Sequence, residues 1–423
     1  MFSRFLLDHA ARLNHFNPMP KLLQINSALN YGSTGRIAEK IGVLAQQNGF
    51  ETFIAHGPRY KNASELKSYQ VVSPFGEKLH GVYSLFLDRH GLASGRETRR
   101  LVEQIETVRP DIIHLHNLHG YYLNYEVLSH YLSSIDIPIV WTLHDCWSFT
   151  GHCSYFDYIG CERWKTECYD CPLVHSYPKS LFVDNSKNNY KRKKAAFTSV
   201  RNLTLVPVSE WLGGLVRDSF LGKYPIDVIR NGTDLTTFSP ENGIDLNARF
   251  GTRGKKYVLG VAAPWSQRKG LDDVVALSWN LNQERYQIVL VGLSSKQISE
   301  LPAGIIGLER TQNVAELAGY YAGADVFINP TLEDNFPTTN IEALACGTPV
   351  VTYRTGGSPE AISSETGLVV EKGNVDELAS AVETICGNGK SAYAAACRAR
   401  AEENYDKDKC FGEYISLYLK LLH

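Results

Sequence analysis

Three acidic side chains frame a predicted strand-to-helix turn in the second half of the chain. Glu333 and Asp334 follow the apolar run ADVFIN, and Glu342 lies further along, before a Cys-Gly-Thr-Pro turn. The pattern predicts a strand, a loop at 331–337 and a helix that begins near Thr338. A carboxylate on the loop and another near the helix start can accept hydrogen bonds from neighbouring hydroxyls of a sugar or a ribose. The attraction of a helix N-terminus for negative charge explains one acid, but not a pair around a loop.

Two cations occupy a comparable position after an earlier predicted strand. Arg268 and Lys269 follow the run KYVLGVAA and precede a predicted helix that begins near Leu271. Two cations beside a helix N-terminus can neutralise a diphosphate, although an ordinary solvated pair would give the same sequence pattern. Gly356 and Gly357 form a further turn before a helix, where they would present backbone N–H groups.

The first half of the chain contains a similar glycine loop. Gly32, Ser33 and Gly35 follow the predicted strand LLQIN, and an amphipathic helix is expected from about Arg36. Free N–H groups and the positive end of the helix dipole would suit an anion there, whereas a plain tight turn is the alternative. The loop matches neither the GxGxxG of dinucleotide-binding proteins nor the GxxxxGK[ST] of P-loop proteins.

One histidine lies where ligands of parallel α/β sheets usually bind. His144 follows the buried run IPIVWTL and is therefore expected at the carboxyl end of a strand. A histidine there can exchange a proton near neutral pH or hydrogen-bond a sugar hydroxyl. His114 and His116, inside the DIIHLHN run, are instead expected to be buried histidines of the core.

Four cysteines lie close together in a segment without clear helix or strand signals. They are Cys153, Cys161, Cys168 and Cys171, and the last two form a CxxC pair. Four thiolates can hold a structural zinc ion in a closed tetrahedral site that orders an irregular loop. A redox-labile pair or plain buried thiols are the alternatives. Because such a site leaves no coordination position open, the zinc would organise the loop and take no part in chemistry.

The order of the predicted elements positions all of these residues. Short β-rich runs alternate with longer helical runs in two successive series, which predicts parallel sheets covered by helices. We therefore expect an α/β protein with two doubly wound, Rossmann-like domains that face each other across a cleft. The expected parts are a lead-in at 1–20, an N-terminal Rossmann-like domain at 21–228 with a cysteine-rich loop at 146–172, a C-terminal Rossmann-like domain at 229–405, and a final helix at 406–423 that could pack back on the first domain.

Composition places the chain among ordinary globular proteins. Its 423 residues are 43% hydrophobic and 21% charged, with a net charge of −2, so nothing indicates a nucleic-acid partner. No apolar run approaches the length of a membrane span, and the interrupted N-terminal apolar stretch does not resemble a secretory signal. Nine cysteines without such a signal favour the cytoplasm. The basic run at 186–197 is expected to be a solvated helix face or a contact for an anionic membrane surface.

Taken together, these residues resemble the family-4 retaining glycosyltransferases of the GT-B fold. The resemblance covers nearly the whole chain from Lys21, and it is strongest at 324–360. There the run DNFPTTNIEALACGTPVVTYRTGG is similar to the family's E-x7-E segment and its following glycine turn. The chain is most similar to the capsular, exopolysaccharide and colanic-acid branch of the family. That branch also shows the TLHDCW run, the cysteine-bearing loop and the R-K-G run.

The resemblance implies that the N-terminal domain is on the acceptor side and that the C-terminal domain binds the nucleotide sugar, and it implies a role for each matching residue. Glu342 would bind the nucleotide ribose and Asp334 would contact the donor sugar, although the family usually has the longer glutamate at the latter position. Lys269 would bind the diphosphate, and Arg268 or another residue would replace the family's second cation, which falls at an uncharged position here. The other matches are His144 beside the donor sugar and, around the donor, Gly32, Ser33, Gly35, Asn335, Phe336, Thr338, Gly356 and Gly357.

The implied reaction transfers a sugar, with retention of its anomeric configuration, from a nucleoside-diphosphate donor to a hydroxyl of a glycan or lipid-linked oligosaccharide. A UDP-sugar is the favoured donor and a GDP-sugar the next. The departing phosphate would act as the base, and the cations and helix N-termini would stabilise it without a metal. No catalytic cofactor is expected, and the enzyme is expected in the cytoplasm, with peripheral contact at the inner face of the plasma membrane as an option.

Two other functions fit the same sequence features. A nucleotide-sugar 2-epimerase would use a similar donor site but no acceptor, and a non-catalytic protein would bind the nucleotide sugar without turnover. A dinucleotide-dependent oxidoreductase fits less well, because the chain lacks GxGxxG and the acidic residue downstream of it.

Overall fold

Each half of the chain is built on one parallel sheet. The structure is a computed structural model that describes residues 19–252 and 254–423, so residues 1–18 of the predicted lead-in lie outside the described part. The chain divides into unit 1, which runs up to Ile229 and includes Phe411–His423, and unit 2, which is Arg230–Cys410. Among the described residues no helix is long and apolar enough to cross a membrane.

Unit 1 contains a six-stranded sheet with the strand order β3-β2-β1-β4-β5-β6. All its pairings are parallel, and β4 and β5 are buried along their whole length, which is typical of a sheet covered on both faces. Its strands are β1 (Lys21–Asn26), β2 (Glu51–His56), β3 (Lys67–Gln70), β4 (Ile112–Leu115), β5 (Ile139–Leu143) and β6 (Leu203–Pro207).

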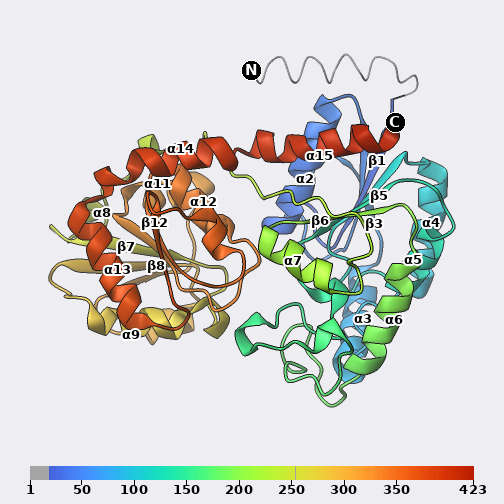
Figure 1. Ribbon diagram of the computed structural model, residues 1–423, viewed down its shortest axis with the longest axis horizontal. Coiled ribbons are helices and arrows are strands. Elements are labelled where there is room, and N and C mark those ends of the chain that lie inside the picture. The colour runs from blue at the N-terminus through green and yellow to red at the C-terminus, as the bar shows by residue number, and fades with distance from the viewer. Residues whose placement is uncertain (1–18, 253) are drawn as a thin grey trace. The chain divides into compact units, whose positions relative to one another are not determined.

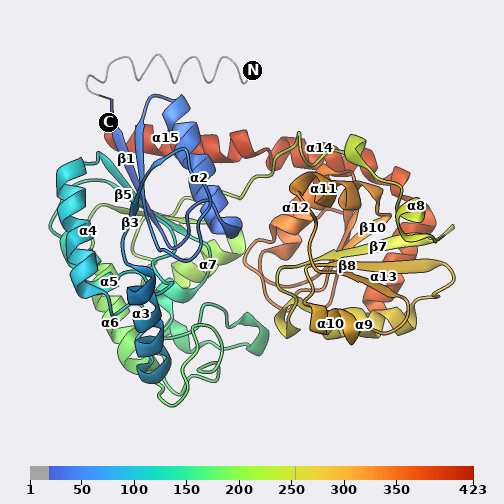
Figure 2. The same ribbon diagram turned by 180° about the vertical axis from the view of Figure 1, so that it is seen from behind.

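Helices cover both faces of this sheet (Figures 1 and 2). On one face the Tyr418 hydroxyl lies 2.6 Å from His114 Nδ1, and this hydrogen bond attaches the last helix to β4. On the other face the rings of Trp141 and Phe197 lie 4.8 Å apart. The helices of unit 1 are α2 (Gly32–Gln47), α3 (Pro74–Leu87), α4 (Gly95–Val108), α5 (Tyr125–Leu132), α6 (Ser186–Thr198) and α7 (Glu210–Asp218), with short turns η1 (Trp147–Phe149), η2 (Asp157–Ile159) and η3 (Arg163–Lys165); α15 (Lys407–Leu422) begins in unit 2 and ends in unit 1.

Unit 2 contains a second six-stranded parallel sheet, with the strand order β12-β11-β10-β7-β8-β9. Its core joins β-branched and leucine residues of the sheet to apolar residues of α9 (Leu271–Asn280) and α13 (Val375–Asn388), such as Val274 and Val382. The strands are β7 (Lys256–Val261), β8 (Tyr286–Val291), β9 (Ile305–Leu308), β10 (Val326–Asn329), β11 (Val350–Tyr353) and β12 (Gly367–Val370).

The helices of unit 2 lie on both faces of its sheet (Figure 1). They are α8 (Leu246–Phe250), α9 (Leu271–Asn280), α10 (Ser295–Ser299), α11 (Val314–Gly323), α12 (Thr338–Ala345), α13 (Val375–Asn388) and α14 (Ala394–Asn404), with turns η4 (Pro240–Asn242), η5 (Gln267–Lys269), η6 (Ser358–Ala361) and η7 (Lys390–Ala392). The predicted α/β class with two doubly wound parallel sheets is confirmed. Sequence patterns did not indicate β3 and β12, which are edge strands with partly exposed residues.

Candidate functional site

Two loops of unit 2 meet at the carboxyl ends of the neighbouring strands β7 and β10. Lys269 donates to Asp334 in an ion pair whose side chains are 21% and 17% exposed. Arg268 Nη1 donates to the Glu333 carbonyl oxygen at 2.8 Å, and the Leu332 N–H donates to the Arg268 carbonyl oxygen at 2.9 Å. The predicted cations and acids therefore lie together, although Lys269 and Asp334 are 65 positions apart in the chain.

Two glycines allow these loops to approach so closely. Gly270 has a φ of +76° and lies against the Pro330 carbonyl, where an added Cβ would collide with the oxygen. Gly356 has a φ of +52° and lies in the same way against the Asp334 carbonyl, which also accepts the Gly357 N–H at 3.2 Å. Other residues rarely adopt this backbone conformation, and no space for a side chain exists, so both positions require glycine.

Glu342 lies on α12 and is oriented by a buried tyrosine. The Tyr321 hydroxyl, from α11, donates to Glu342 Oε2 at 3.0 Å. Burial, and next the neighbouring Glu342 charge, raise the pKa of Tyr321 well above its usual value. The hydroxyl therefore remains a protonated donor, which holds the carboxylate in one orientation. Glu342 itself is half-buried and remains accessible from solvent.

A buried network of amide and hydroxyl side chains connects the ends of β10 and β11 to the helical turns that follow. Asn329 Nδ2 donates to Asn340 Oδ1 at 2.8 Å, and Asn340 Nδ2 donates to Ser358 Oγ at 3.0 Å. Thr352 Oγ1 donates to the Asn329 carbonyl at 2.9 Å. These residues were missed by the sequence analysis, because Asn and Ser near predicted turns are common and only the fold brings them together. Their hydrogen bonds hold the start of α12 beside the end of β10.

The N-terminus of α12 has no side-chain cap, because Pro337 occupies the N-cap position, and its first turn contains no acid. Asn335 and Phe336, in the loop before it, are 3% and 5% exposed, and the Phe336 ring lies 5.8 Å from that of Tyr405. Uncapped N–H groups at a helix start favour an anion. Unit 2 therefore combines two cations, an uncapped helix start, a carboxylate on the loop before it and a carboxylate within the helix.

The glycine loop predicted in unit 1 belongs to the first turn of α2. The helix begins at Gly32, not near Arg36 as expected, so Ser33 and Gly35 are helical residues. Gly32 has a φ of +65°, and a Cβ at Gly35 would lie 3.2 Å from Ala28 Cβ, so the glycines let the helix start directly beside the end of β1. This N-terminus also has no side-chain cap and no acid in its first turn, which suits an anion.

His144 directly follows β5, at the carboxyl end of the sheet in unit 1. Its Nε2 lies 3.2 Å from His116 Nδ1, and His116 Nε2 lies 3.0 Å from Gln24 Oε1. Gln24 Oε1 can only accept, so we assign the protons to His116 Nε2 and His144 Nε2. Burial lowers the pKa of His144 to about 4. The imidazole is therefore neutral at pH 7, with its lone pair on Nδ1.

A second histidine lies near the same strand end and was not singled out from the sequence. His119 Nε2 lies 2.7 Å from Asp145 Oδ2, and His119 Nδ1 lies 3.0 Å from the Tyr177 hydroxyl. Burial raises the pKa of Asp145, but the His119 charge and hydrogen bond together with the Trp147 N–H outweigh it, so the net shift is downward. Asp145 is therefore ionised and orients His119. The sequence signal for this pair was Asp145, which directly follows His144.

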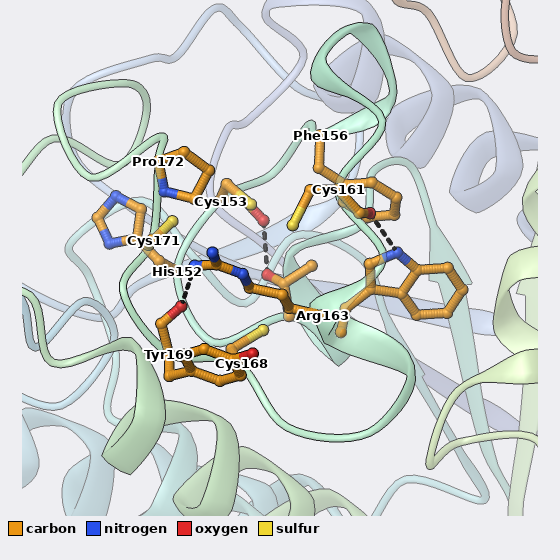
Figure 3. Close-up of a pocket in the computed structure, with 11 residues that line it drawn as sticks. His152, Cys153, Phe156, Cys161, Arg163, Cys168, Tyr169, Cys171 and Pro172 are labelled. Carbon is orange, nitrogen blue, oxygen red and sulfur yellow. Dashed lines mark hydrogen bonds between the residues drawn. The ribbon is translucent and has the colours of Figure 1, made fainter.

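The four predicted zinc ligands line one cavity of about 20 Å³ in the loop after β5 (Figure 3). Cys153, Cys161, Cys168 and Cys171 are all free thiols. The Gly151 N–H donates to Cys168 Sγ at 3.2 Å, and a hydrogen bond between the Cys153 and Cys171 thiols lowers the pKa of Cys171 to about 7. In the part of the chain that the structure describes, no three His, Cys, Asp or Glu side chains are grouped as a preassembled metal site.

The basic run at 186–197 forms α6, and one of its cations faces inward. Lys193 is buried, donates to the Trp147 carbonyl at 2.6 Å and lies 3.5 Å from the centre of the Trp147 ring. Burial lowers its pKa to about 7. The prediction of a solvated basic face is therefore wrong for Lys193, because the indole face and a carbonyl replace water around the ammonium. The surface pairs of this helix are Arg192–Glu126, Lys187–Glu167 and Lys191–Glu167.

Two family models and a known protein match this chain. The family model described as Glycosyltransferase Family 4 matches residues 42–237, and the model described as Glycosyl transferases group 1 matches residues 255–388. A protein of Escherichia coli (strain K12) that carries the name colanic acid biosynthesis glycosyl transferase WcaC is 24% identical over 422 residues. That match covers 95% of this chain and 100% of the relative.

Solved structures show the same arrangement of elements. Sucrose-phosphate synthase from Thermosynechococcus elongatus matches with a TM-score of 0.72 and 17% identity, over 95% of this chain and 99% of the other. Anabaena Alr3699/HepE, solved in complex with UDP, matches with a TM-score of 0.64 and 15% identity, over 94% and 99%. At these identities the likeness concerns the fold.

Proposed function

The chain belongs to the family-4 glycosyltransferases of the GT-B fold, and we propose that it transfers a hexose from a UDP-sugar to a glycan or lipid-linked acceptor in polysaccharide synthesis. The observation that carries the proposal is the set of charged groups in unit 2. Lys269, Arg268 and Asp334 lie on adjacent loops beside the uncapped start of α12, and Glu342 lies within α12. This combination suits a diphosphate attached to two polyhydroxylated rings.

In this proposal Glu342 binds the ribose of the nucleotide. Its carboxylate is half-buried, and the Tyr321 hydroxyl already orients one of its oxygens at 3.0 Å. A carboxylate held in this way can accept hydrogen bonds from both ribose hydroxyls, because it has two oxygens and about four acceptor positions. Because this contact involves only the ribose, it would be the same for a uridine donor and a guanosine donor.

The diphosphate would bind to the Lys269 ammonium and to the N–H groups at the start of α12. Arg268 adds a second positive charge, with Nη1 held by the Glu333 carbonyl at 2.8 Å. Charge that develops on the departing diphosphate would be stabilised by these fixed groups, which is why we propose chemistry without a metal ion. Asp334, which accepts a hydrogen bond from Lys269, would lie at the boundary between the diphosphate and the sugar.

In unit 1 we propose roles for His144 and for the start of α2. Because the His144 imidazole is neutral at pH 7, it would hydrogen-bond a sugar hydroxyl and would not act as a cation. We propose retention of configuration with the departing phosphate oxygen as the base for the acceptor hydroxyl, so no protein carboxylate is assigned as a nucleophile.

The similar proteins support the proposed donor and the proposed class of acceptor. The HepE structures are complexes with UDP, UDP and glucose, and UDP-glucose, which favours a uridine donor. The name of the Escherichia coli relative indicates colanic acid biosynthesis, which favours a polysaccharide or its lipid-linked precursor as acceptor.

The first experiment is a thermal-shift panel with UDP, GDP, dTDP, ADP and NAD. Stabilisation by UDP is expected, and at about 100 times its dissociation constant it should amount to about 2.7 kcal/mol. Stabilisation by NAD alone would overturn the proposal. Incubation with a UDP-sugar and an acceptor glycan, followed by NMR of the anomeric proton, then tests retention; conversion of the sugar to its 2-epimer without acceptor would show an epimerase instead.

Two variants separate binding from transfer. Glu342→Ala should weaken nucleotide binding, whereas His144→Ala should leave binding unchanged and reduce the rate of sugar transfer. If both variants transferred sugar at the parent rate, the assignment of these residues would be wrong.

We also propose that Cys153, Cys161, Cys168 and Cys171 bind one structural zinc ion. The four thiols line a single cavity, whose volume of about 20 Å³ is close to that of one small occupant. Tetrahedral coordination would require the thiol side chains to turn toward a common point. The benefit would be structural, since the surrounding loop contains only short turns and no strand.

A further inference from the structure

Helix α3 of unit 1 has its apolar side chains on the outside. Phe75 is 70% exposed, Leu79 54%, Val82 51% and Phe86 46%. Their spacing repeats every three to four residues, so they form one continuous stripe along the helix. Leu87, at the end of the stripe, is 40% exposed. A surface helix of a globular protein normally directs such a stripe toward the core.

Polar side chains hold the other face of α3 in place. His80 and Ser84 are the buried residues of this helix. His80 Nδ1 lies 2.9 Å from Ser94 Oγ, at the start of α4. Asp88, which ends the helix, lies 2.5 Å from His152 Nδ1 and accepts the Asn185 N–H at 2.8 Å. The stripe is therefore not needed to attach α3 to unit 1. Its exposure to water is unfavourable, and the packing of α3 does not require it.

A neighbouring segment extends the apolar surface. Phe182 is 78% exposed, and its ring stacks on that of Phe86 with the centroids 5.9 Å apart. The Leu181 N–H donates to the Leu85 carbonyl at 2.9 Å, which attaches this segment to α3. Figure 2 shows α3 on the near side of unit 1. We call Phe75, Leu79, Val82, Phe86, Leu87, Phe182 and Val183 the α3 face.

Exposed basic side chains lie in α3 and in the segment that follows it. Residues 74–100 contain five Lys and Arg against three Asp and Glu, and one of the acids, Asp88, is buried against His152. The five cations are all exposed: Lys78, Arg89, Arg96, Arg99 and Arg100. The contact between His80 and Ser94 places the first turn of α4, with its arginines, beside α3. The segment is thus positive, although the whole chain carries a net charge of −2.

We propose that the α3 face docks on the surface of an anionic lipid bilayer, with its Phe and Leu side chains at the boundary between headgroups and acyl chains. Exposed Phe and Leu with a rim of Lys and Arg are the composition of helices that lie in a membrane interface. Each exposed cation adds attraction to anionic headgroups. A symmetric contact between two copies of this face would instead bring the same cations against each other, which disfavours a second copy as the occupant.

The proposal does not depend on the sugar-transfer reaction. It states a surface property of unit 1, which can be measured without any donor or acceptor, so it can fail while the proposed reaction stands. It also replaces α6 as the expected membrane contact, because Lys193 of that helix is buried and Arg192, Lys187 and Lys191 are paired with acids.

The test is flotation of the full-length protein with vesicles of phosphatidylcholine alone or of equal parts phosphatidylcholine and phosphatidylglycerol. Binding to the anionic vesicles is expected, with weaker binding at high salt. Leu79→Ser together with Phe86→Ser should lower the partition coefficient at least about tenfold, because these apolar side chains could no longer be buried in the lipid. Trp279→Ser removes a side chain that is 69% exposed in unit 2 and is the matched control, with no loss expected.

Other outcomes would overturn the proposal. One is a parent protein that does not float with either vesicle. Another is a double variant that floats as well as the parent. Equal thermal unfolding temperatures of parent and variants would show that the changes act at the surface. If the parent were a dimer in light scattering and the double variant a monomer that had not lost vesicle binding, the α3 face would be a protein interface.

Discussion

Replacement of Lys269 by methionine should weaken the binding of UDP without weakening the binding of uridine. Methionine preserves much of the side-chain volume and removes the charge. In the structure the ammonium donates to Asp334, and the lysine side chain is 21% exposed. The variant therefore removes the cation nearest to the proposed diphosphate position and leaves the ribose contact at Glu342 intact.

The magnitude follows from the environment of this pair. Two unit charges 4 Å apart interact by about 4 kcal/mol at an effective dielectric constant of ~20, the value suited to groups near a protein surface. Asp334 neutralises part of the lysine charge, and solvent screens the rest, so about 1.5–3 kcal/mol should remain for a charge-assisted hydrogen bond to phosphate. This corresponds to roughly a 10- to 100-fold increase in the dissociation constant of UDP.

Isothermal titration calorimetry with UDP and with uridine is the assay. The control is Lys296→Met, which removes an exposed lysine that pairs with Glu300 elsewhere in unit 2. Glu342→Ala tests the ribose contact instead, since it should weaken the binding of UDP and of uridine by similar factors. An unchanged UDP affinity in Lys269→Met, or an equal loss for uridine, would refute the assignment of Lys269 to the diphosphate.

Three further results are expected. Gly356→Ala should lower the unfolding temperature of unit 2 and weaken UDP binding, because the added Cβ meets the Asp334 carbonyl at a backbone φ of +52°; an unchanged affinity in calorimetry would contradict this. Burial lowers the pKa of His144 to about 4 and of His114 to about 3, so the stability they contribute is complete above about pH 6.5 and is lost as the pH falls toward these values. All histidines lie outside 230–410, so hydrogen exchange at pH 5 should show unit 1 destabilised relative to unit 2, and uniform destabilisation would be evidence against this cause. Finally, inductively coupled plasma mass spectrometry of the purified protein should find one zinc per chain, and chelation should increase proteolysis in the cysteine loop; zinc-free protein with an equally resistant loop would exclude the site.

Much of the fold could be predicted because the evidence for it is local. A buried parallel strand flanked by turns needs a run of β-branched and leucine residues, and β5 and β8 show such runs directly. The helix starts at Thr338 and Leu271 follow from equally local signals. The pattern was insufficient at the edges of both sheets, where β3 and β12 are short and partly exposed and so lack a continuous apolar run.

The candidate site was predicted as a set of residues but not as a set of contacts. The position of Lys269 after one strand and of Asp334 after another was readable, yet their ion pair depends on β7 and β10 being neighbours in the sheet. Strand order is a property of the whole unit, so no local pattern contains it. The same holds for the network around Asn340, which joins residues from two strand ends and two helical turns.

The sequence by itself determined the alternation of strands and helices, the residue types at the strand ends and the family, because each depends on neighbouring residues or on a short motif. The tertiary structure alone decided which of those residues touch and which side chains are buried. Lys193 and the α3 stripe show the physical reason most directly. A lysine in a basic run is buried over Trp147, and the phenylalanines of an amphipathic helix are exposed, because burial depends on what packs against a face and not on the face itself.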